Sequence, residues 1–302
     1  MTLRGARIAV TGATGFLGRY IVDVLLERGA HVIGVVRNPD RVPELRRRGV
    51  ELRQADLADR TRLAAGFDGA DAVVSNAALY SLGNQRWEDH HRANVEGIRN
   101  VLAALGDAGV RRAVHVSSVA VYGMGALGTI KEDDPQLSET SRRWPWNVYA
   151  ISKAVSEQLA WTFAREHDLQ LTTVRPCTIY GAFDANFMPV FRRLVGLPLT
   201  VMPAWLHIGF VYAGDVADAI ACALERDVAV GRAYNTTNLD ETVWEFAQAW
   251  REAGGRTARL TLPLPVPLAK RFDSTRARTE LGWETRSLVE GLRDTFRLER
   301  GT

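Results

Sequence analysis

The 302-residue chain has few residues of several kinds, and each scarcity excludes a class of protein. Two cysteines, Cys177 and Cys222, are too few for a disulfide framework, and their spacing fits no metal-binding or redox motif. No apolar run approaches the about 20 residues that span a bilayer. The N-terminus leads directly into a strand-like segment rather than a signal peptide. We therefore expect a cytoplasmic protein with free thiols, no bound metal and no membrane partner.

An excess of charge of one sign is also lacking. Thirty-eight basic residues face 35 acidic ones, a net charge of +3, so we expect no nucleic-acid partner although the pI is about 9.0. Lysine is rare among the basic residues, because Lys131, Lys153 and Lys270 are the three lysines of the chain. A coding preference for arginine would explain this. Arginine and lysine nevertheless differ chemically, so the role of each remaining lysine is a separate question.

Strand and helix signals alternate in the first half of the chain, whose composition is that of a globular protein. Strands are predicted at residues 7–11, 31–36, 50–55, 72–75, 113–117 and 171–175. The helices between them are predicted to end at Gly29 and at Gly109, and a long helix covers residues 149–166. This βαβ repetition with right-handed crossovers predicts the α/β class, with a doubly wound parallel sheet of the Rossmann type over residues 1–175.

The sequence pattern changes after residue 175, where the predicted strands and helices become shorter and proline becomes more frequent. Residues 176–302 are predicted to form mainly a smaller, discontinuous substrate-binding region, with some segments returning to the first domain. Helices are expected over residues 215–226 and 242–253. Ser287 and Glu290 have the spacing of a capping box that begins the last helix.

A glycine-rich loop separates the first strand from the first helix. Residues 11–18 read Thr-Gly-Ala-Thr-Gly-Phe-Leu-Gly. This glycine spacing lets the chain turn tightly, approach a pyrophosphate and pack the helix close to the sheet, while the helix N-terminus offers N–H groups to phosphate. The alternative is a tight turn without a ligand. The pattern predicts a dinucleotide-binding domain whose loop contacts come from Gly12, Thr14, Gly15, Phe16, Leu17 and Gly18.

The end of the second strand distinguishes NAD from NADP. An acidic residue there would bind the ribose 2′-hydroxyl of NAD, but the sequence after Val36 is Arg37-Asn38, with no carboxylate before Asp40. Arg37 can pair with a 2′-phosphate, so we expect NADP, with NAD possible, unless Arg37 is an ordinary surface arginine. Asp56, after the third strand, either caps the helix that begins near Asp59 or bonds the adenine amino group.

A phenol and an amine, Tyr149 and Lys153, lie four residues apart on one face of the long helix. A phenol with a pKa of about 10 is a poor base at neutral pH, but a nearby ammonium and a nicotinamide positive charge would lower that pKa. Tyr149 could then exchange a proton with a substrate oxygen while hydride moves to or from the cofactor. Ser118 follows the fifth strand and would hold that oxygen. An exposed helix pair and a strand-end cap are the alternatives.

Along nearly its whole length the chain resembles the extended short-chain dehydrogenase/reductase family, the NAD-dependent epimerase/dehydratase group. The matching segments are residues 11–18, 56, 76–78, 94–97, 117–118, 122–123, 149–153, 175–176, 178–181, 215–217 and 281–283. The resemblance implies a catalytic triad of Ser118, Tyr149 and Lys153, in which Lys153 also bonds the nicotinamide ribose. It also implies a homodimer formed through a helix bundle that includes the Tyr149 helix. The further cofactor-binding residues expected on this basis are Leu57, Asn76, Ala77, Ala78, Asn94, Val116, Pro176 and Thr178.

Departures from the family pattern narrow the substrate. Members that act on nucleotide-linked sugars commonly carry one Arg shortly before the segment matching residues 210–215 and another upstream of 273–277. Here those places hold Leu-His-Ile-Gly at 206–209 and an apolar, proline-rich stretch at 262–267. A buried diphosphate without such partners is costly, although Arg192, Arg193 or His207 could compensate. Large apolar side chains flank the site as pocket walls or as core. The substrate-binding residues expected are Tyr80, Ser118, Trp146, Phe187 and Trp205.

The sequence therefore predicts an NADP-preferring carbonyl reductase or alcohol dehydrogenase for a small or medium organic substrate. Its character is nearest to the dihydroflavonol reductases and hydroxysteroid dehydrogenases of the family. The first alternative is a nucleotide-sugar epimerase or dehydratase that retains NAD. The second is a non-catalytic dinucleotide sensor, against which the Tyr149–Lys153 pair argues.

Overall fold

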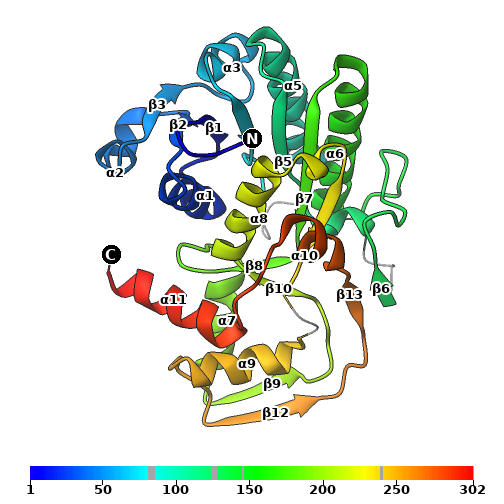
Figure 1. Ribbon diagram of the computed structural model, residues 1–302. Helices are drawn as coiled ribbons and strands as arrows, with labels where there is room; N and C mark the ends of the chain where they lie inside the picture. Colours follow the sequence, from blue (N-terminus) through cyan, green and yellow to red (C-terminus); the bar gives the residue numbers. More distant parts are fainter. Residues whose placement is uncertain (81–85, 124–127, 145, 239–240, 302) are drawn as a thin grey trace.

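A seven-stranded sheet forms the centre of the molecule, in a computed structural model that describes residues 1–80, 86–123, 128–144, 146–238 and 241–301. The spatial order is β11-β7-β5-β4-β1-β2-β3, and every pairing in it is parallel (Figure 1). The strands are β1 (Arg7–Thr11), β2 (His31–Val36), β3 (Glu51–Gln54), β4 (Ala72–Ser75), β5 (Arg112–Val116), β7 (Gln170–Pro176) and β11 (Ala233–Thr236). Because the winding direction reverses between β1 and β4, a ligand crevice is expected at their carboxyl ends. The predicted doubly wound sheet is confirmed.

Helices cover both faces of this sheet. Those facing one side are α1 (Phe16–Glu27) and α8 (Ala213–Glu225), which contact each other. Those facing the other side are α3 (Arg60–Phe67), α5 (Gly97–Asp107) and α6 (Val148–His167). Alternate strand residues supply the two cores, since Val10 and Val114 belong to the first and Ala9 and Ala113 to the second. The long buried helix α6 is thereby packed against the sheet next to β5 and β7.

Most predicted boundaries of the first half agree with the structure. The strands at residues 7–11, 31–36 and 72–75 coincide with β1, β2 and β4, and Gly29 follows α1 with φ +80°. The helix predicted before Gly109 is in fact composite, because a π-helical turn, η2 (His91–Glu96), precedes α5. Such turns are frequent at functional sites, and this one carries Asn94. Three short elements complete this half: η1 (Pro39–Arg41), α2 (Pro43–Arg47) and α4 (Trp87–His90).

Outside the central sheet, the described residues form three two-stranded parallel pairs and several helices, most of them from the chain beyond β7 and lying mostly below the sheet in the view of Figure 1. The pairs are β8 (Thr178–Tyr180) with β10 (Phe210–Tyr212), β9 (Leu199–Pro203) with β12 (Leu260–Leu264), and β6 (Gly128–Ile130) with β13 (Lys270–Phe272). The remaining elements are η3 (Val119–Tyr122), α7 (Phe187–Val195), η4 (Asp227–Ala229), α9 (Val243–Glu252), α10 (Thr275–Leu281) and α11 (Leu288–Arg300). The predicted capping box is confirmed at α11. The domain division after residue 175 stays a prediction.

Three further features concern membrane crossing, metal binding and the state of the cysteines. Among the described helices, none combines the length and the hydropathy that crossing a bilayer requires. The described residues contain no cluster of three His, Cys, Asp or Glu side chains placed to hold a metal ion. Cys177 and Cys222 are both free thiols.

Candidate active site

The three glycines of the loop between β1 and α1 serve different purposes. Gly12 has φ +69°, and a Cβ there would lie 2.9 Å from the Cα of Ala77. A Cβ at Gly18 would overlap the carbonyl oxygen of Gly12, so α1 begins in direct contact with the loop. Gly15 is the N-cap residue of α1 and supplies no side-chain cap to the first turn. The positive end of the helix and its N–H groups therefore lie open at the crevice.

This loop fits the pyrophosphate of a dinucleotide. Thr14 and Gly15 are exposed, whereas the side chain of Leu17 is buried in the core and only its backbone can face a ligand. The loop after β4 lies against the same turn. The hydroxyl oxygen of Thr11 accepts the N–H groups of Asn76 and Ala77, both at 3.1 Å, and the Asn76 amide donates to the carbonyl oxygen of Gly12. The two loops that flank the crevice are thus joined, as a shared cofactor cradle requires.

Asn94 connects the loop after β4 to the catalytic helix. Its amide nitrogen donates to the carbonyl oxygen of Leu79 at 3.0 Å and to Oγ of Ser152 at 2.9 Å, and its Oδ1 accepts the N–H of Leu79. Ser152 lies on α6 and donates in turn to the carbonyl oxygen of Tyr149. Asn94 therefore fixes the position of α6 relative to the crevice, and its contact with the cofactor stays a prediction.

Arg37 lies just beyond β2 and is exposed. Its carbonyl oxygen accepts a hydrogen bond from Gln54, while no described residue pairs with its guanidinium. The helix-cap interpretation of Asp56 is wrong. The carboxylate of Asp56 accepts the N–H of Ala58 within its own turn, and Asp59 caps α3 because the helix begins directly after it. The adenine contact of Asp56 stays a prediction.

The three predicted catalytic residues meet at the carboxyl end of β5. The ammonium of Lys153 donates to the carbonyl oxygen of Val116, the last residue of the strand, at 2.7 Å. Ser118 is the N-cap residue of η3, and its Oγ accepts the N–H of Ala120 at 3.1 Å. The hydroxyl of Ser118 is also near enough to the phenol of Tyr149 to lower the pKa of that phenol. One strand end and the first turns of one helix thus assemble the triad.

Burial governs the charge state of this group. It raises the pKa of Tyr149, and the nearby hydroxyl of Ser118 opposes that rise. Burial lowers the pKa of Lys153 to about 8, while the carboxylate of Glu157, one turn further along α6, opposes the fall. The phenol therefore keeps its proton in the chain alone, and the ammonium of Lys153 gives up its proton more readily than an exposed lysine does.

A buried ion pair lies behind the triad and was not predicted from the sequence. Glu157 is 0% exposed and Arg175 3%, and their carboxylate oxygen and guanidinium nitrogen lie 2.5 Å apart. Arg175 also donates to the hydroxyl of Tyr122 at 2.6 Å and to the carbonyl oxygen of Glu132. The pair joins α6 to the end of β7, next to Pro176. The signal in the sequence that could have drawn attention to Glu157 is its spacing from Lys153, because residues four apart lie on one face of a helix.

The structure brings one predicted aromatic residue directly to the catalytic phenol. The ring centroids of Tyr80 and Tyr149 lie 4.8 Å apart, and Tyr80 is 46% exposed. Trp146 precedes α6, is 64% exposed and stacks on Trp144 with 6° between the ring planes. Burial raises the pKa of Tyr80, so this phenol is neutral too. Tyr80 and Trp146 therefore offer exposed aromatic surface near the N-terminal end of α6.

The other predicted pocket residues lie in the C-terminal region. Phe187 begins α7 and packs its half-buried ring among Phe191, Phe210 and Phe246. Trp205 follows β9 and is 59% exposed. Pro176 ends β7, and Thr178 begins β8 two residues later. Leu57 follows β3 and packs against Gly97. The substrate contacts of Phe187 and Trp205 stay predictions.

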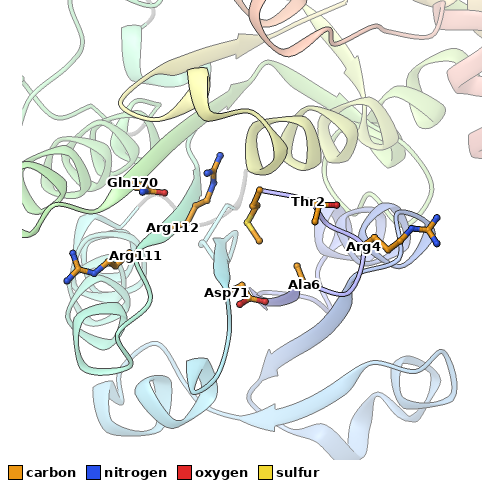
Figure 2. A pocket seen from close by; sticks show the side chains of 8 residues that line it. Thr2, Arg4, Ala6, Asp71, Arg111, Arg112 and Gln170 are labelled. Carbon is orange, nitrogen blue, oxygen red and sulfur yellow. The ribbon is translucent and has the colours of Figure 1, made fainter.

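One hollow of the surface lies away from the crevice that the loops after β1 and β4 form. A depression of about 500 Å³ is surrounded by side chains that include Arg4, Asp71, Arg111, Arg112 and Gln170 (Figure 2). These residues precede or begin β1, β4, β5 and β7, so the depression lies at the amino edge of the sheet, opposite the crevice. Arg112 is bound there to Asp227. Since open α/β sheets bind ligands at the carboxyl edge, this depression is not part of the candidate site.

Comparison with known proteins gives one family and several reductases. The model described as the NAD dependent epimerase/dehydratase family matches residues 8–236. Cinnamoyl-CoA reductase 1 of Arabidopsis thaliana is 30% identical over 324 residues, covering 97% of this chain and 89% of the relative. The 4-hydroxy-2-methyl-3-oxo-4-farnesyl-3,4-dihydroquinoline-1-oxide ketoreductase of Stigmatella aurantiaca is 35% identical over 226 residues, covering 73% of this chain and 65% of the relative.

Among solved structures, the dTDP-glucose 4,6-dehydratase of Streptomyces venezuelae with bound NAD superposes on this chain with a TM-score of 0.80. The two share 26% sequence identity, and the match covers 98% of this chain and 97% of that one. This chain thus shares the fold of a dehydratase that was solved with NAD, while the two relatives named above carry the names of reductases.

Proposed function

The chain belongs to the NAD-dependent epimerase/dehydratase family of extended short-chain dehydrogenases/reductases, and within it we propose an NADP-preferring carbonyl reductase or alcohol dehydrogenase. The meeting of Ser118, Tyr149 and Lys153 at the end of β5 is the observation that carries the proposal. Its substrate is a small or medium organic carbonyl compound or the corresponding alcohol. Two similar proteins that are named as reductases support reduction of a carbonyl group as the reaction.

The nicotinamide, when bound, supplies or takes up hydride, and the residues of the chain position the reactants and move the proton. The hydroxyl of Ser118 holds the substrate oxygen beside Tyr149. Tyr149 gives its phenolic proton to that oxygen in reduction and removes it in oxidation. Lys153, fixed to the carbonyl oxygen of Val116, stabilises the phenolate that remains. The open N-terminus of α1, with Gly15 as its cap, holds the pyrophosphate.

Arg37 supports the preference for NADP. It follows β2 at the place where an NAD-specific chain carries an acid, and it is exposed with no described partner for its guanidinium. A 2′-phosphate would accept charge-assisted hydrogen bonds from this side chain. Asn38 adds no negative charge because its amide is uncharged, and its Oδ1 accepts the N–H of Asp40.

A nucleotide-sugar epimerase or dehydratase is the second candidate, favoured by the match to the solved dehydratase over nearly the whole chain. Two features weigh against it. Arg192, one of the side chains that could hold a diphosphate, is paired with Glu299 of α11. The exposed surface of β12 is formed by Leu260, Leu262 and Leu264 rather than by a basic residue.

A single preparation separates the two candidates. The purified protein is analysed by mass spectrometry for bound cofactor and is then assayed for NADPH oxidation with a panel of aldehydes and ketones. The reductase predicts net NADPH consumption matched by alcohol formation. Tightly bound NAD, no net oxidation of NADPH and conversion of a sugar nucleotide would instead establish the epimerase or dehydratase.

A further inference from the structure

His115 lies in the interior beside Lys153 and has no part in the triad. It is the fourth residue of β5 and is 4% exposed. Its partners in the neighbouring strands are Ser75 of β4 and Thr173 of β7. Side chains alternate along a strand, so the imidazole faces the same layer as Ala113, which packs with α5 and α6. The ring therefore points toward the helix that carries Lys153.

A small cavity connects the two residues. Its volume is about 10 Å³, and its lining includes His115, Lys153, Asn94 and Ser75. This is about the volume that holds one water molecule. Neither ring nitrogen of His115 has a hydrogen-bond partner among the described residues. A buried imidazole normally satisfies its polar atoms, so the polar cavity is the place where this one does so.

The charge states of the two groups are complementary. Burial and the nearby Lys153 ammonium hold the pKa of His115 well below its usual value of 6.5, so the ring is neutral and has one nitrogen that accepts a hydrogen bond. Lys153 has three N–H donors, and Val116 accepts one of them. The other groups near this amine are the uncharged Asn94 and Ser75 at the cavity and the carboxylate of Glu157, which is bound to Arg175.

We propose that His115 is a positioning residue for Lys153, whose neutral imidazole accepts a hydrogen bond from the ammonium through one water molecule in the shared cavity and stabilises its charged form. The catalytic consequence of this contact rests on the proposed function. The contact itself does not, because it concerns two buried groups of the chain alone. Its effect can therefore be measured without substrate and without turnover.

The scarcity of lysine makes the measurement direct. Protein labelled with carbon-13 at Cε of lysine gives NMR signals from three residues, Lys131, Lys153 and Lys270. The variants Lys131→Arg and Lys270→Arg identify two signals and leave the third to Lys153. Titration of the wild type should then show Lys153 losing its proton near pH 8.

His115→Phe keeps a flat ring of similar size and removes the acceptor. We expect the pKa of Lys153 to fall by at least about 0.5 in this variant, because the ammonium loses a partner while it stays buried. His115→Gln supplies an amide oxygen and should restore most of the wild-type value. The signals of Lys131 and Lys270 serve as internal controls and should not move. In an active enzyme, the alkaline limit of kcat should move by the same amount.

An unchanged Lys153 titration in His115→Phe would overturn the inference, as would a His115→Gln protein whose Lys153 titrates as low as that of His115→Phe. If His115→Phe does not fold, His115→Leu provides the same comparison with a smaller apolar side chain. A protein that shows the Lys153 shift but reduces no carbonyl compound refutes the proposed function and leaves the inference standing. Carbonyl reduction without the shift does the reverse.

Discussion

The ammonium of Lys153 donates a hydrogen bond to the carbonyl oxygen of Val116, and this 2.7 Å contact joins the catalytic helix α6 to the end of β5. Because the acceptor belongs to the backbone, the strand offers it whatever side chain residue 116 carries. The donor is a compact ammonium in a buried place. The relative position of Tyr149 and Ser118 therefore depends on a lysine, in a chain whose basic residues are almost all arginine.

Lys153→Arg should lower kcat by at least about 100-fold although it keeps the positive charge. The planar guanidinium is larger and cannot take the same place between Val116 and the phenol. Steady-state kinetics with NADPH and the best carbonyl substrate measures the loss. Lys131→Arg is the matched control, since the Lys131 side chain is exposed and has no described contact with the triad, and it should retain full activity. An active Lys153→Arg enzyme would contradict a specific role for the ammonium.

The pH profile of kcat should fall on the alkaline side, as pH rises through about 8. The sign follows from the direction of the pKa shift. Burial lowers the pKa of Lys153, so the ammonium is present below about pH 8 and is lost above it. Its loss removes the charge that stabilises a Tyr149 phenolate. Initial rates at saturating NADPH from pH about 6 to about 10 test this. A rate that stays constant up to the upper limit would show that Lys153 keeps its proton or is not needed.

Arg37→Ala should weaken NADPH binding by about 10-fold to 100-fold, as expected for the loss of hydrogen bonds to a charged group. NADH lacks the 2′-phosphate, so its affinity should change little. Binding of both cofactors can be measured by titration calorimetry. Arg41→Ala removes an exposed arginine of the same loop and is the control. Equal losses for both cofactors would show that Arg37 does not contact the 2′-phosphate.

Glu157→Gln should lower the free energy of unfolding by about 3–5 kcal/mol, because Arg175 then stays buried without a compensating charge. The double variant Glu157→Gln/Arg175→Met should be more stable than the sum of the single losses predicts. Urea unfolding monitored by tryptophan fluorescence measures the wild type, the single variants Glu157→Gln and Arg175→Met, and the double variant. If the single variants and the double variant differ additively, the two side chains do not interact as the structure shows.

The parts of this fold that sequence predicted well are those determined by local pattern. β1 is a β-branched run before a glycine loop, and α1 ends where Gly29 takes a positive φ. Tyr149 and Lys153 could be paired because a helix brings residues four apart to one face. The doubly wound parallel arrangement followed from the βαβ repetition, whereas the order of the strands came from the structure.

Contacts between distant segments could not be predicted in the same way. The ion pair of Glu157 and Arg175 depends on α6 packing against β7, and β9 pairs with β12 across a long stretch of chain. The bond from Lys153 to Val116 uses a backbone carbonyl, which no residue type reveals. His115 was visible as an isolated imidazole in an apolar strand, but its cavity exists only once α5, α6 and β5 are packed. Asp56 and Asp59 were confused because either can cap a nearby helix.

Removal of the Tyr149 hydroxyl tests the proposed proton transfer most directly. Tyr149→Phe removes the phenolic oxygen and leaves the ring, so NADPH binding and folding should be unchanged. Stopped-flow oxidation of NADPH with the best carbonyl substrate should slow by at least about 100-fold, the range associated with loss of a general acid. A Tyr149→Phe enzyme that reduces the same substrate at the wild-type rate would contradict the role of Tyr149 as the proton donor.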